Sequence, residues 1–253
     1  MHAGKTVSRV PEPRIHGTNV KTVLITGAGG FIGSHLAERC IEQGYSVRAL
    51  VRYNSRNSWG WLDQSSSLSD IDARVGDVRD PDACASAIEG VDTVYHLAAL
   101  ISIPYSYAAP LSYLRTNVEG THNILQAARS HDVGSVVVTS TSEVYGTAQY
   151  VPIDEKHPLN AQSPYAASKT GADQLALSYH LSFGMRVHIA RPFNVYGPRQ
   201  SSRAIIPTVI TQILAGNREL RLGNLTPTRD LTFVSDTVAG FIAVSESKDL
   251  VGQ

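Results

Sequence analysis

The chain has 253 residues, so by length it is one large domain or two small ones. Lys plus Arg and Asp plus Glu both total 22, and this balance excludes an overall basic charge that would draw the protein onto nucleic acid or an anionic membrane. Cys40 and Cys84 lie far apart without Cys/His ligand spacing, no apolar run is long enough to span a bilayer, and the first residues lack a secretory signal. We therefore expect a cytoplasmic protein with reduced thiols, no metal and a small-molecule ligand.

The chain opens with residues 1–20, whose Pro, Gly and mixed charge are typical of a loose tail. From Lys21 onward, short apolar runs alternate with helical stretches, which is the rhythm of βαβ units. The expected fold is α/β, a Rossmann-type doubly wound parallel sheet. We assign 21–190 to an NAD(P)-binding domain with the catalytic residues, and 191–253 to a substrate-binding region interleaved with the last sheet elements. The pattern predicts strands at 21–26, 45–51, 72–77, 92–99, 135–140 and 185–193, with helices at 34–44, 81–90, 115–132 and 163–184.

The loop TGAGGFIGSHL lies between the first strand and the first helix. Glycine is needed there because the backbone must turn tightly, approach a pyrophosphate closely and start a helix whose N-terminal amides face the anion. The spacing is GxxGxxG, with Gly29 as an additional glycine, and it indicates the short-chain dehydrogenase branch of the fold. The loop predicts a dinucleotide site whose contacts are Gly27, Gly30, Phe31, Ile32 and Gly33.

The second strand ends without the acid that usually binds the adenosine ribose hydroxyls. Val51 and Arg52 stand where that acid is expected, and Arg56 follows closely. Arginine suits a ribose 2′-phosphate, so the cofactor is NAD or NADP with NADP favoured, although solvated loop charges are the alternative interpretation. The polar stretch 54–70 carries both tryptophans, and it is either a wall of the site or a mobile surface loop.

Further cofactor contacts follow the third and fourth strands. Asp77 and Val78 are expected to contact adenine, while HLAA, with Leu97, Ala98 and Ala99, ends the strand where the cofactor ribose passes. We include Asn117 in the cofactor set.

A candidate catalytic group comes next in the chain, in the stretches STSEVYG and SPYAASK. Tyr165 and Lys169 are four residues apart, hence on one helix face. Tyrosine is a poor base at neutral pH, and a nearby ammonium favours its phenolate. The alternative for this pair is a surface helical contact, but its place after a glycine-loop strand and a TST strand end favours catalysis.

These motifs, together with GDVRD, HLAA, TNVEGTHNILQAA, RPFNVYGPRQ and RDLTFVSD, resemble the extended short-chain dehydrogenase/reductase superfamily, specifically its NAD(P)-dependent nucleotide-sugar epimerases and dehydratases. The resemblance implies that Thr141, Tyr165 and Lys169 form the catalytic triad, with Thr141 bonding the substrate C4 hydroxyl. It implies that the residues holding the nucleotide diphosphate are Asn194, Arg199 and Arg229. Structural ion pairing is the alternative for Arg191 and Arg229.

Glu143 separates the possible reactions. A simple 4-epimerase needs no second base, whereas a 4,6-dehydratase needs a carboxylate to remove the C5 proton beside the C4 ketone. The resemblance is greatest to GDP-mannose 4,6-dehydratases and to legionaminic-pathway NDP-N-acetylglucosamine 4,6-dehydratases. In dTDP-glucose 4,6-dehydratases an Asp stands where this chain has Ser142, so either Ser142 relays a proton or Glu143 serves both steps. Alternatives are a UDP-glucuronate decarboxylase, which also carries Thr-Ser-Glu, a 4-epimerase, a helix-capping role for Glu143, and a non-catalytic dinucleotide-binding protein.

The resemblance also concerns size and assembly. Relatives continue past RDLTFVSDTVAGFIAVSES with the rest of a small substrate lobe, so that lobe is expected to be truncated in this chain. The family further suggests a homodimer through the helices around 115–130 and 164–183.

Overall fold

The computed structural model describes residues 20–253, so the tail expected at 1–20 lies, apart from Val20, outside the described residues. The body is a six-stranded parallel sheet with the order β3-β2-β1-β4-β5-β6, as the βαβ rhythm predicts. The first three strands are β1 (Thr22–Thr26), β2 (Ser46–Val51) and β3 (Ile71–Val75), and the others are β4 (Thr93–His96), β5 (Ser135–Thr139) and β6 (Val187–Ala190).

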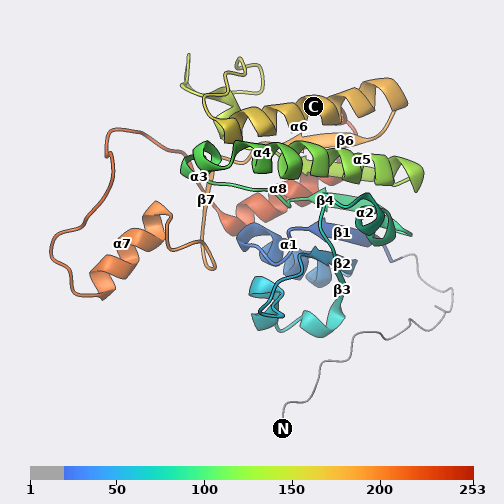
Figure 1. The fold of residues 1–253 in the computed structure, drawn as a ribbon, viewed down its shortest axis with the longest axis horizontal. Coiled ribbons are helices and arrows are strands. Elements are labelled where there is room, and N and C mark those ends of the chain that lie inside the picture. The colour runs from blue at the N-terminus through green and yellow to red at the C-terminus, as the bar shows by residue number, and fades with distance from the viewer. Residues whose placement is uncertain (1–19) are drawn as a thin grey trace, which may run out of the picture.

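Helices cover both faces of the sheet (Figure 1). One face carries α1 (Phe31–Glu42) and α8 (Val234–Glu246), and the other carries α2 (Pro81–Ile88), α5 (Gly120–Ser130) and α6 (Pro164–Phe183). The remaining helices on this body are the short α3 (Ile103–Ala108) and α4 (Pro110–Tyr113). The helix predicted at 115–132 begins as a π-helical stretch, Leu114–Glu119, and becomes α-helical only at Gly120.

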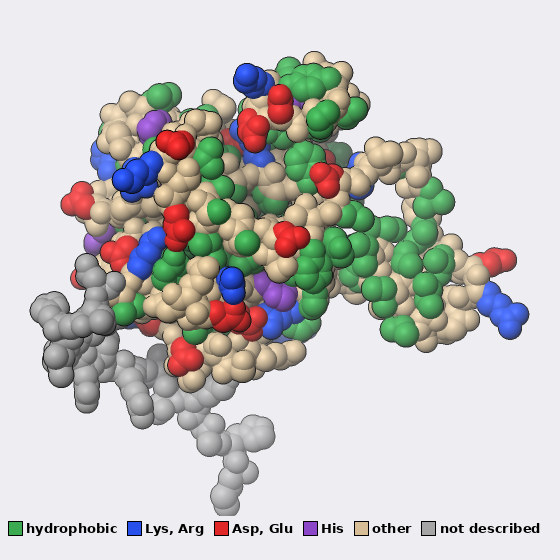
Figure 2. All heavy atoms as spheres, turned by 180° about the vertical axis from the view of Figure 1, so that it is seen from behind, with side chains coloured by type: hydrophobic (Ala, Val, Ile, Leu, Met, Phe, Trp, Pro, Cys, Tyr) green, Lys and Arg blue, Asp and Glu red, His purple; other side chains and the backbone are tan. Residues whose placement is uncertain are grey.

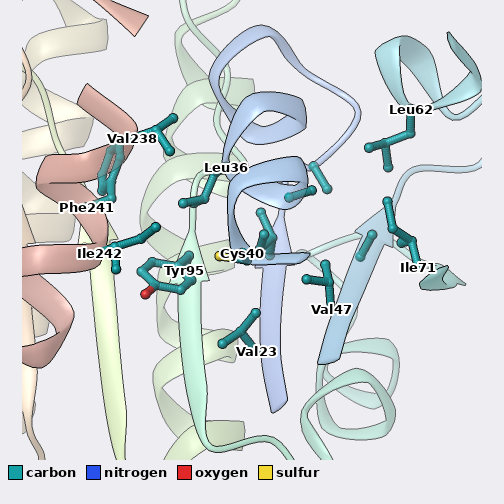
Figure 3. Close-up of a cluster of buried hydrophobic side chains, with 14 of the residues drawn as sticks. Val23, Leu36, Cys40, Val47, Leu62, Ile71, Tyr95, Val238, Phe241 and Ile242 are labelled. Carbon is teal, nitrogen blue, oxygen red and sulfur yellow. The ribbon is translucent and has the colours of Figure 1, made fainter. Parts of the chain in front are cut away.

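The core consists of two apolar layers, one on each face of the sheet. Figure 3 shows the layer between the sheet and the helices α1 and α8, where Cys40 of α1 points toward the ring of Tyr95 on β4 and Ile242 of α8 lies beside that ring. All five residues of β1 are buried, since a parallel strand covered on both faces needs apolar side chains on both. Both cysteines are free and buried, and burial raises the pKa of each thiol to about 12.

The strand order reverses between β1 and β4, the two central strands. In open α/β sheets a ligand binds outside the carboxyl ends of the strands at such a switch point. The glycine loop follows β1 and the HLAA segment follows β4, so both lie at this position.

The segment after β6 leaves the body and returns to it. It forms a separate two-stranded sheet from β7 (Asn194–Tyr196) and β8 (Leu231–Phe233), with α7 (Ile205–Leu214) between them. Figure 1 shows α7 standing apart from the body, and Figure 2 shows apolar side chains gathered over this protrusion. Half or more of each of these α7 side chains is exposed: Ile205, Ile210, Ile213 and Leu214. Across residues 20–253, no helix has both the length and the apolar character that crossing a membrane requires.

Candidate active site

A cleft of about 1130 Å³ opens at the carboxyl ends of the strands. It is bounded by the loops that follow β1 to β5 and by the segment from Pro192 to Leu231. Most residues predicted from the sequence line it, which brings the cofactor and catalytic candidates into one cavity. Those residues are Gly27, Gly30, Phe31, Ile32, Gly33, Arg52, Asp77, Val78, Leu97, Ala98, Ala99, Thr141, Tyr165, Lys169, Asn194 and Arg229.

The glycine loop fits a dinucleotide in its backbone geometry. Gly27 has φ of +72°, which L side chains rarely adopt, and a Cβ on Gly33 would lie 2.3 Å from the Gly27 carbonyl oxygen. Helix α1 starts at Phe31 without a side-chain cap on its first amides. Those N–H groups, together with the positive end of the helix dipole, form the kind of site that binds a pyrophosphate.

The stretch 54–70 forms a wall of the cleft. Its short 3₁₀ helix, Gly60–Gln64, packs on the glycine loop, and the Trp61 N–H donates to the Gly29 carbonyl at 3.0 Å. A Cβ on Gly29 would lie 2.3 Å from the Trp59 carbonyl oxygen, which explains the additional glycine. The residues of this wall that line the cleft are Asn54, Ser58, Trp59 and Gly60.

The far end of the cleft, after β2 and β3, carries a cluster of charges. Arg52 and Arg79 both line it, and Asp77 accepts from Arg79 Nε at 2.9 Å and from Nη2 at 2.6 Å. Arg79 is the largest influence holding the pKa of Asp77 below its usual range, and the Arg52 charge acts in the same direction. Asp77 is the only carboxylate among the described lining residues, and it already accepts hydrogen bonds from Arg79.

The catalytic candidates are brought together by two local structures at the other side of the cleft. Thr141 follows β5 and caps the short 3₁₀ helix Ser142–Tyr145, its hydroxyl accepting from the Glu143 N–H at 3.3 Å. Helix α6 begins at Pro164 behind the N-cap Ser163, whose hydroxyl accepts from the Ala166 N–H at 3.0 Å. The Thr141 hydroxyl hydrogen-bonds the Tyr165 phenol in the first turn of α6. Burial leaves Thr141 and Tyr165 each 9% exposed.

Burial shifts the pKa values of Tyr165 and Lys169 in opposite directions. Burial raises the pKa of Tyr165, whereas the bond from Thr141 lowers it. Lys169 Nζ donates to the Thr139 carbonyl, and burial lowers the pKa of this lysine to about 8.

Asn117, expected as a cofactor contact, is not among the described residues that line the cleft. It is 1% exposed, and its amide oxygen accepts from the Leu100 N–H at 2.8 Å while its amide nitrogen donates to the Leu100 carbonyl at 3.0 Å. The amide nitrogen also donates to the Ser168 hydroxyl at 2.9 Å. Asn117 thus anchors the loop after β4 to α6 and shapes the cleft from behind.

Arg199, expected to hold the nucleotide diphosphate, is not among the described residues that line the cleft. Its guanidinium forms a two-pronged ion pair with Glu38 on α1, at 2.8 and 2.9 Å, and donates to Ser34 at 3.1 Å. Arg199 instead fastens the loop after β7 onto α1.

Ser142 and Glu143 are half-buried and are not among the described residues that line the cleft. The Ser142 N–H donates to the Pro192 carbonyl at 3.2 Å, which fixes the turn that carries both. The Glu143 carboxylate nevertheless belongs to the surroundings of the phenol, because its charge raises the pKa of Tyr165.

Sequence reasoning missed two groups around the triad. The Tyr113 ring packs edge-on against Tyr165 with centroids 6.1 Å apart, and its hydroxyl donates to the Ile101 carbonyl at 2.5 Å. Asp173, fully buried on α6, forms an ion pair with Arg191 at 3.0 Å. A signal for Asp173 was present, since it lies four residues after Lys169 on a helix face that is otherwise buried.

Comparison with known proteins places the chain among nucleotide-sugar enzymes. The family model for GDP-mannose 4,6 dehydratase matches residues 24–251. A dTDP-glucose 4,6-dehydratase from Streptomyces griseus is 35% identical over 228 residues, which cover 88% of this chain and 69% of that relative.

Solved structures agree with this placement. A UDP-N-acetylglucosamine 4-epimerase from Methanobrevibacter ruminantium superposes with a TM-score of 0.83 at 31% identity, covering 91% of this chain and 74% of that one. A dTDP-glucose 4,6-dehydratase from Streptomyces venezuelae with NAD bound gives 0.81 at 34% identity, covering 91% and 73%. From its fold, its motifs and the family match over residues 24–251, the chain belongs to the GDP-mannose 4,6 dehydratase family.

Proposed function

We propose that the protein is an NAD(P)-dependent nucleotide-sugar 4,6-dehydratase. The observation that carries this proposal is the Glu143 carboxylate, whose charge acts on the phenol of the Thr141, Tyr165 and Lys169 group. An epimerase needs only the three, whereas dehydration needs a carboxylate as well. Asp77, the only carboxylate among the described lining residues, follows β3, on the other side of β1 from Thr141, and is paired with Arg79.

The cleft residues that would hold the dinucleotide are the glycine loop and α1 N-terminus for the pyrophosphate, Arg52 for the adenosine ribose, and Lys169 for the nicotinamide end. When bound, the dinucleotide accepts the hydride from sugar C4 and later returns it to C6, so no external reductant is consumed.

Tyr165 Oη takes the proton of the C4 hydroxyl as that carbon is oxidised. Thr141 donates a hydrogen bond that favours the negative form of the tyrosine, and Lys169 supplies a positive charge one helical turn away. Burial of all three excludes water, which would otherwise weaken these interactions.

Glu143 removes the C5 proton, which the adjacent C4 ketone has made acidic. Ser142 has no acidic group to protonate the departing C6 hydroxyl, so we assign that proton to Glu143 as well. Glu143 takes the proton from C5 and gives it to the C6 oxygen, which departs as water. When hydride returns to C6, C5 takes up one proton from solvent through the same carboxyl group, so the atoms balance without a second acid.

We assign binding of the nucleotide-sugar substrate to the segment 191–233, which includes β7, α7 and β8. Asn194 and Arg229 line the cleft from this segment, and Arg229 is exposed, with one nitrogen donating to the Thr228 carbonyl at 3.0 Å. Its remaining donors suit a diphosphate. We therefore propose that the dinucleotide-binding domain comprises residues 21–190 and ends before Arg191.

A substrate panel tests the proposed function. The protein is incubated with UDP- and GDP-N-acetylglucosamine, GDP-mannose, dTDP-glucose and UDP-glucuronate, and the products are identified by mass spectrometry. The expected result is loss of one water from one of the neutral hexose nucleotides. Loss of carbon dioxide means a decarboxylase, an unchanged mass with a new sugar means an epimerase, and no reaction favours a binding protein.

We further propose NADP as the preferred dinucleotide, because Arg52 lines the cleft where NAD-binding relatives of this fold carry an acid. An Arg52→Asp variant is expected to lower the ratio of NADP to NAD affinity by about tenfold or more, since a charge-assisted hydrogen bond contributes about 1.5–3 kcal/mol. Titration calorimetry with both dinucleotides measures the ratio.

The matched control is Arg56→Asp, which changes the same charge in the same loop at an exposed position outside the cleft lining. Its affinity ratio is expected to stay at the parent value. An unchanged ratio in Arg52→Asp, or equal losses in both variants, contradicts the proposed role of Arg52.

We also propose a homodimer that pairs α5 and α6 with their counterparts in a second copy. Leu181 and Phe183 near the end of α6 are 80% and 51% exposed, and Leu114 before α5 is 50% exposed. Apolar side chains at this density on adjacent helices suit a helical interface. Light scattering coupled to size exclusion is expected to give twice the chain mass, and a monomer at all concentrations would refute this proposal.

A further inference from the structure

A buried carboxylate lies behind the catalytic group. Asp173 is on α6, one turn after Lys169, and it is 0% exposed. Its Oδ2 accepts from the Ser140 hydroxyl at 2.9 Å and from Arg191 Nε at 3.0 Å, while its Oδ1 has no hydrogen-bond partner among the described residues. A buried charge without full hydrogen bonding is expensive, so it needs an explanation beyond packing.

Asp173 connects the two halves of the catalytic site. It is the one carboxylate whose charge acts on Lys169 in the described structure. Its partner Arg191 also donates to the Tyr145 hydroxyl at 3.2 Å, and the guanidinium lies 5.3 Å from the centre of the Tyr145 ring. Tyr145 ends the short helix that carries Glu143. One buried carboxylate, one helical turn from Lys169, is therefore connected through Arg191 to the turn that presents the proposed base.

An apolar arrangement of the same volume would be about as stable as a buried ion pair, so stability alone does not account for this one. We propose that Asp173 is a positioning residue, the shared counter-ion that keeps Lys169 charged and, through Arg191 and Tyr145, holds the Glu143 turn against α6. This role rests on the proposed function for its effect on turnover, and on the contacts above for its physical basis.

The charged and titratable groups around this pair come from every neighbouring element. They are His96 at the end of β4, Tyr113 on α4, Glu143 on the short 3₁₀ helix, Tyr165 on α6 and Arg191 after β6. His96 is neutral, because burial lowers its pKa to about 3, and it hydrogen-bonds Thr26 and Thr121. It therefore does not replace the charge of Asp173.

Removal of the Asp173 charge changes two pKa values in the same direction. Asp173 raises the pKa of Lys169, which burial has lowered to about 8, and it also raises the pKa of Tyr165. Turnover needs the lysine protonated and the tyrosine able to lose its proton. In Asp173→Asn both limbs of the pH profile of kcat are therefore expected to move to lower pH together. A merely structural defect lowers the maximum without moving both limbs.

Direct titration of Lys169 tests the proposal without any assay of turnover. The chain has five lysines, so the Cε resonances of ¹³C-lysine-labelled full-length protein are few, and Lys169→Met identifies the relevant one. The expected midpoint is near pH 8 in the parent and lower by about one pH unit in Asp173→Asn, as for loss of an opposite charge within a few ångströms. The exposed Asp82→Asn on α2 is the matched control and should leave the midpoint unchanged.

If Asp173→Asn does not fold, the double variant Asp173→Asn/Arg191→Met removes both buried charges and must still show the lowered midpoint. A midpoint equal to that of the parent in the folded variant overturns the proposal. If the parent turns over no sugar nucleotide, the proposed function fails, whereas the lysine titration still decides the role of Asp173.

Discussion

Replacement of Tyr165 by Phe is expected to slow nucleotide-sugar turnover by about a hundredfold to ten-thousandfold, the usual contribution of a positioned proton-transfer group. The phenol is buried, bonded to Thr141 and held in the first turn of α6. Because the site is buried, a water molecule cannot replace the Tyr165 oxygen as the acceptor of the C4 hydroxyl proton. The ring is retained, and with it the packing on Tyr113. Dinucleotide affinity is therefore expected to change by less than about threefold.

The matched control is Tyr179→Phe on the same helix. Tyr179 is also buried, but its hydroxyl bonds His122 and Gln126 on α5, both at 3.1 Å, outside the cleft. Steady-state rates of the two variants with the substrate identified in the panel measure the effect. A Tyr165→Phe enzyme as fast as the control means that the proton acceptor is another group.

Replacement of Glu143 by Gln is expected to separate the two stages of the reaction. Oxidation at C4 depends on Tyr165 and should continue, whereas removal of the C5 proton loses its base and should fall by about a hundredfold to ten-thousandfold. In heavy water the parent incorporates deuterium at C5 and releases water. Glu143→Gln should show neither, while its 4-keto sugar is trapped by borohydride and detected by mass spectrometry.

Glu155→Gln supplies the matched control, because Glu155 is an exposed carboxylate beyond the same loop and outside the cleft. It should exchange and dehydrate like the parent. If Glu143→Gln also dehydrates normally, Glu143 is the capping side chain that the sequence left as an alternative, and the base lies elsewhere. If Glu143→Gln loses C4 oxidation as well, its carboxylate serves the first step or the structure of the turn.

Local motifs predicted the parallel sheet and the backbone geometry of the glycine loop, because these depend on short-range geometry. The glycine loop needs a positive φ at Gly27 and close approach at Gly33, and both follow from the pattern of a strand, glycines and a helix. The four-residue spacing of Tyr165 and Lys169 likewise determines that they share a helix face.

Partner choice across the fold was not predictable in the same way. A motif identifies Arg199 as a cation, but its partner Glu38 lies 161 residues away and becomes a neighbour only when the loop after β7 reaches α1. The partner of Asn117 was equally unpredictable, because its side-chain amide hydrogen-bonds the backbone of Leu100, 17 residues earlier in the chain. The pKa of Tyr165 could not be judged from its spacing to Lys169 either, because burial, which raises it, depends on the whole surrounding structure.

Turnover of the panel substrates in heavy water tests the central claim most directly. The account predicts a product that has lost one water and carries one solvent deuterium at C5, formed without added reductant. A product that has lost carbon dioxide, or one of unchanged sugar mass with no deuterium at C5, would contradict a 4,6-dehydratase.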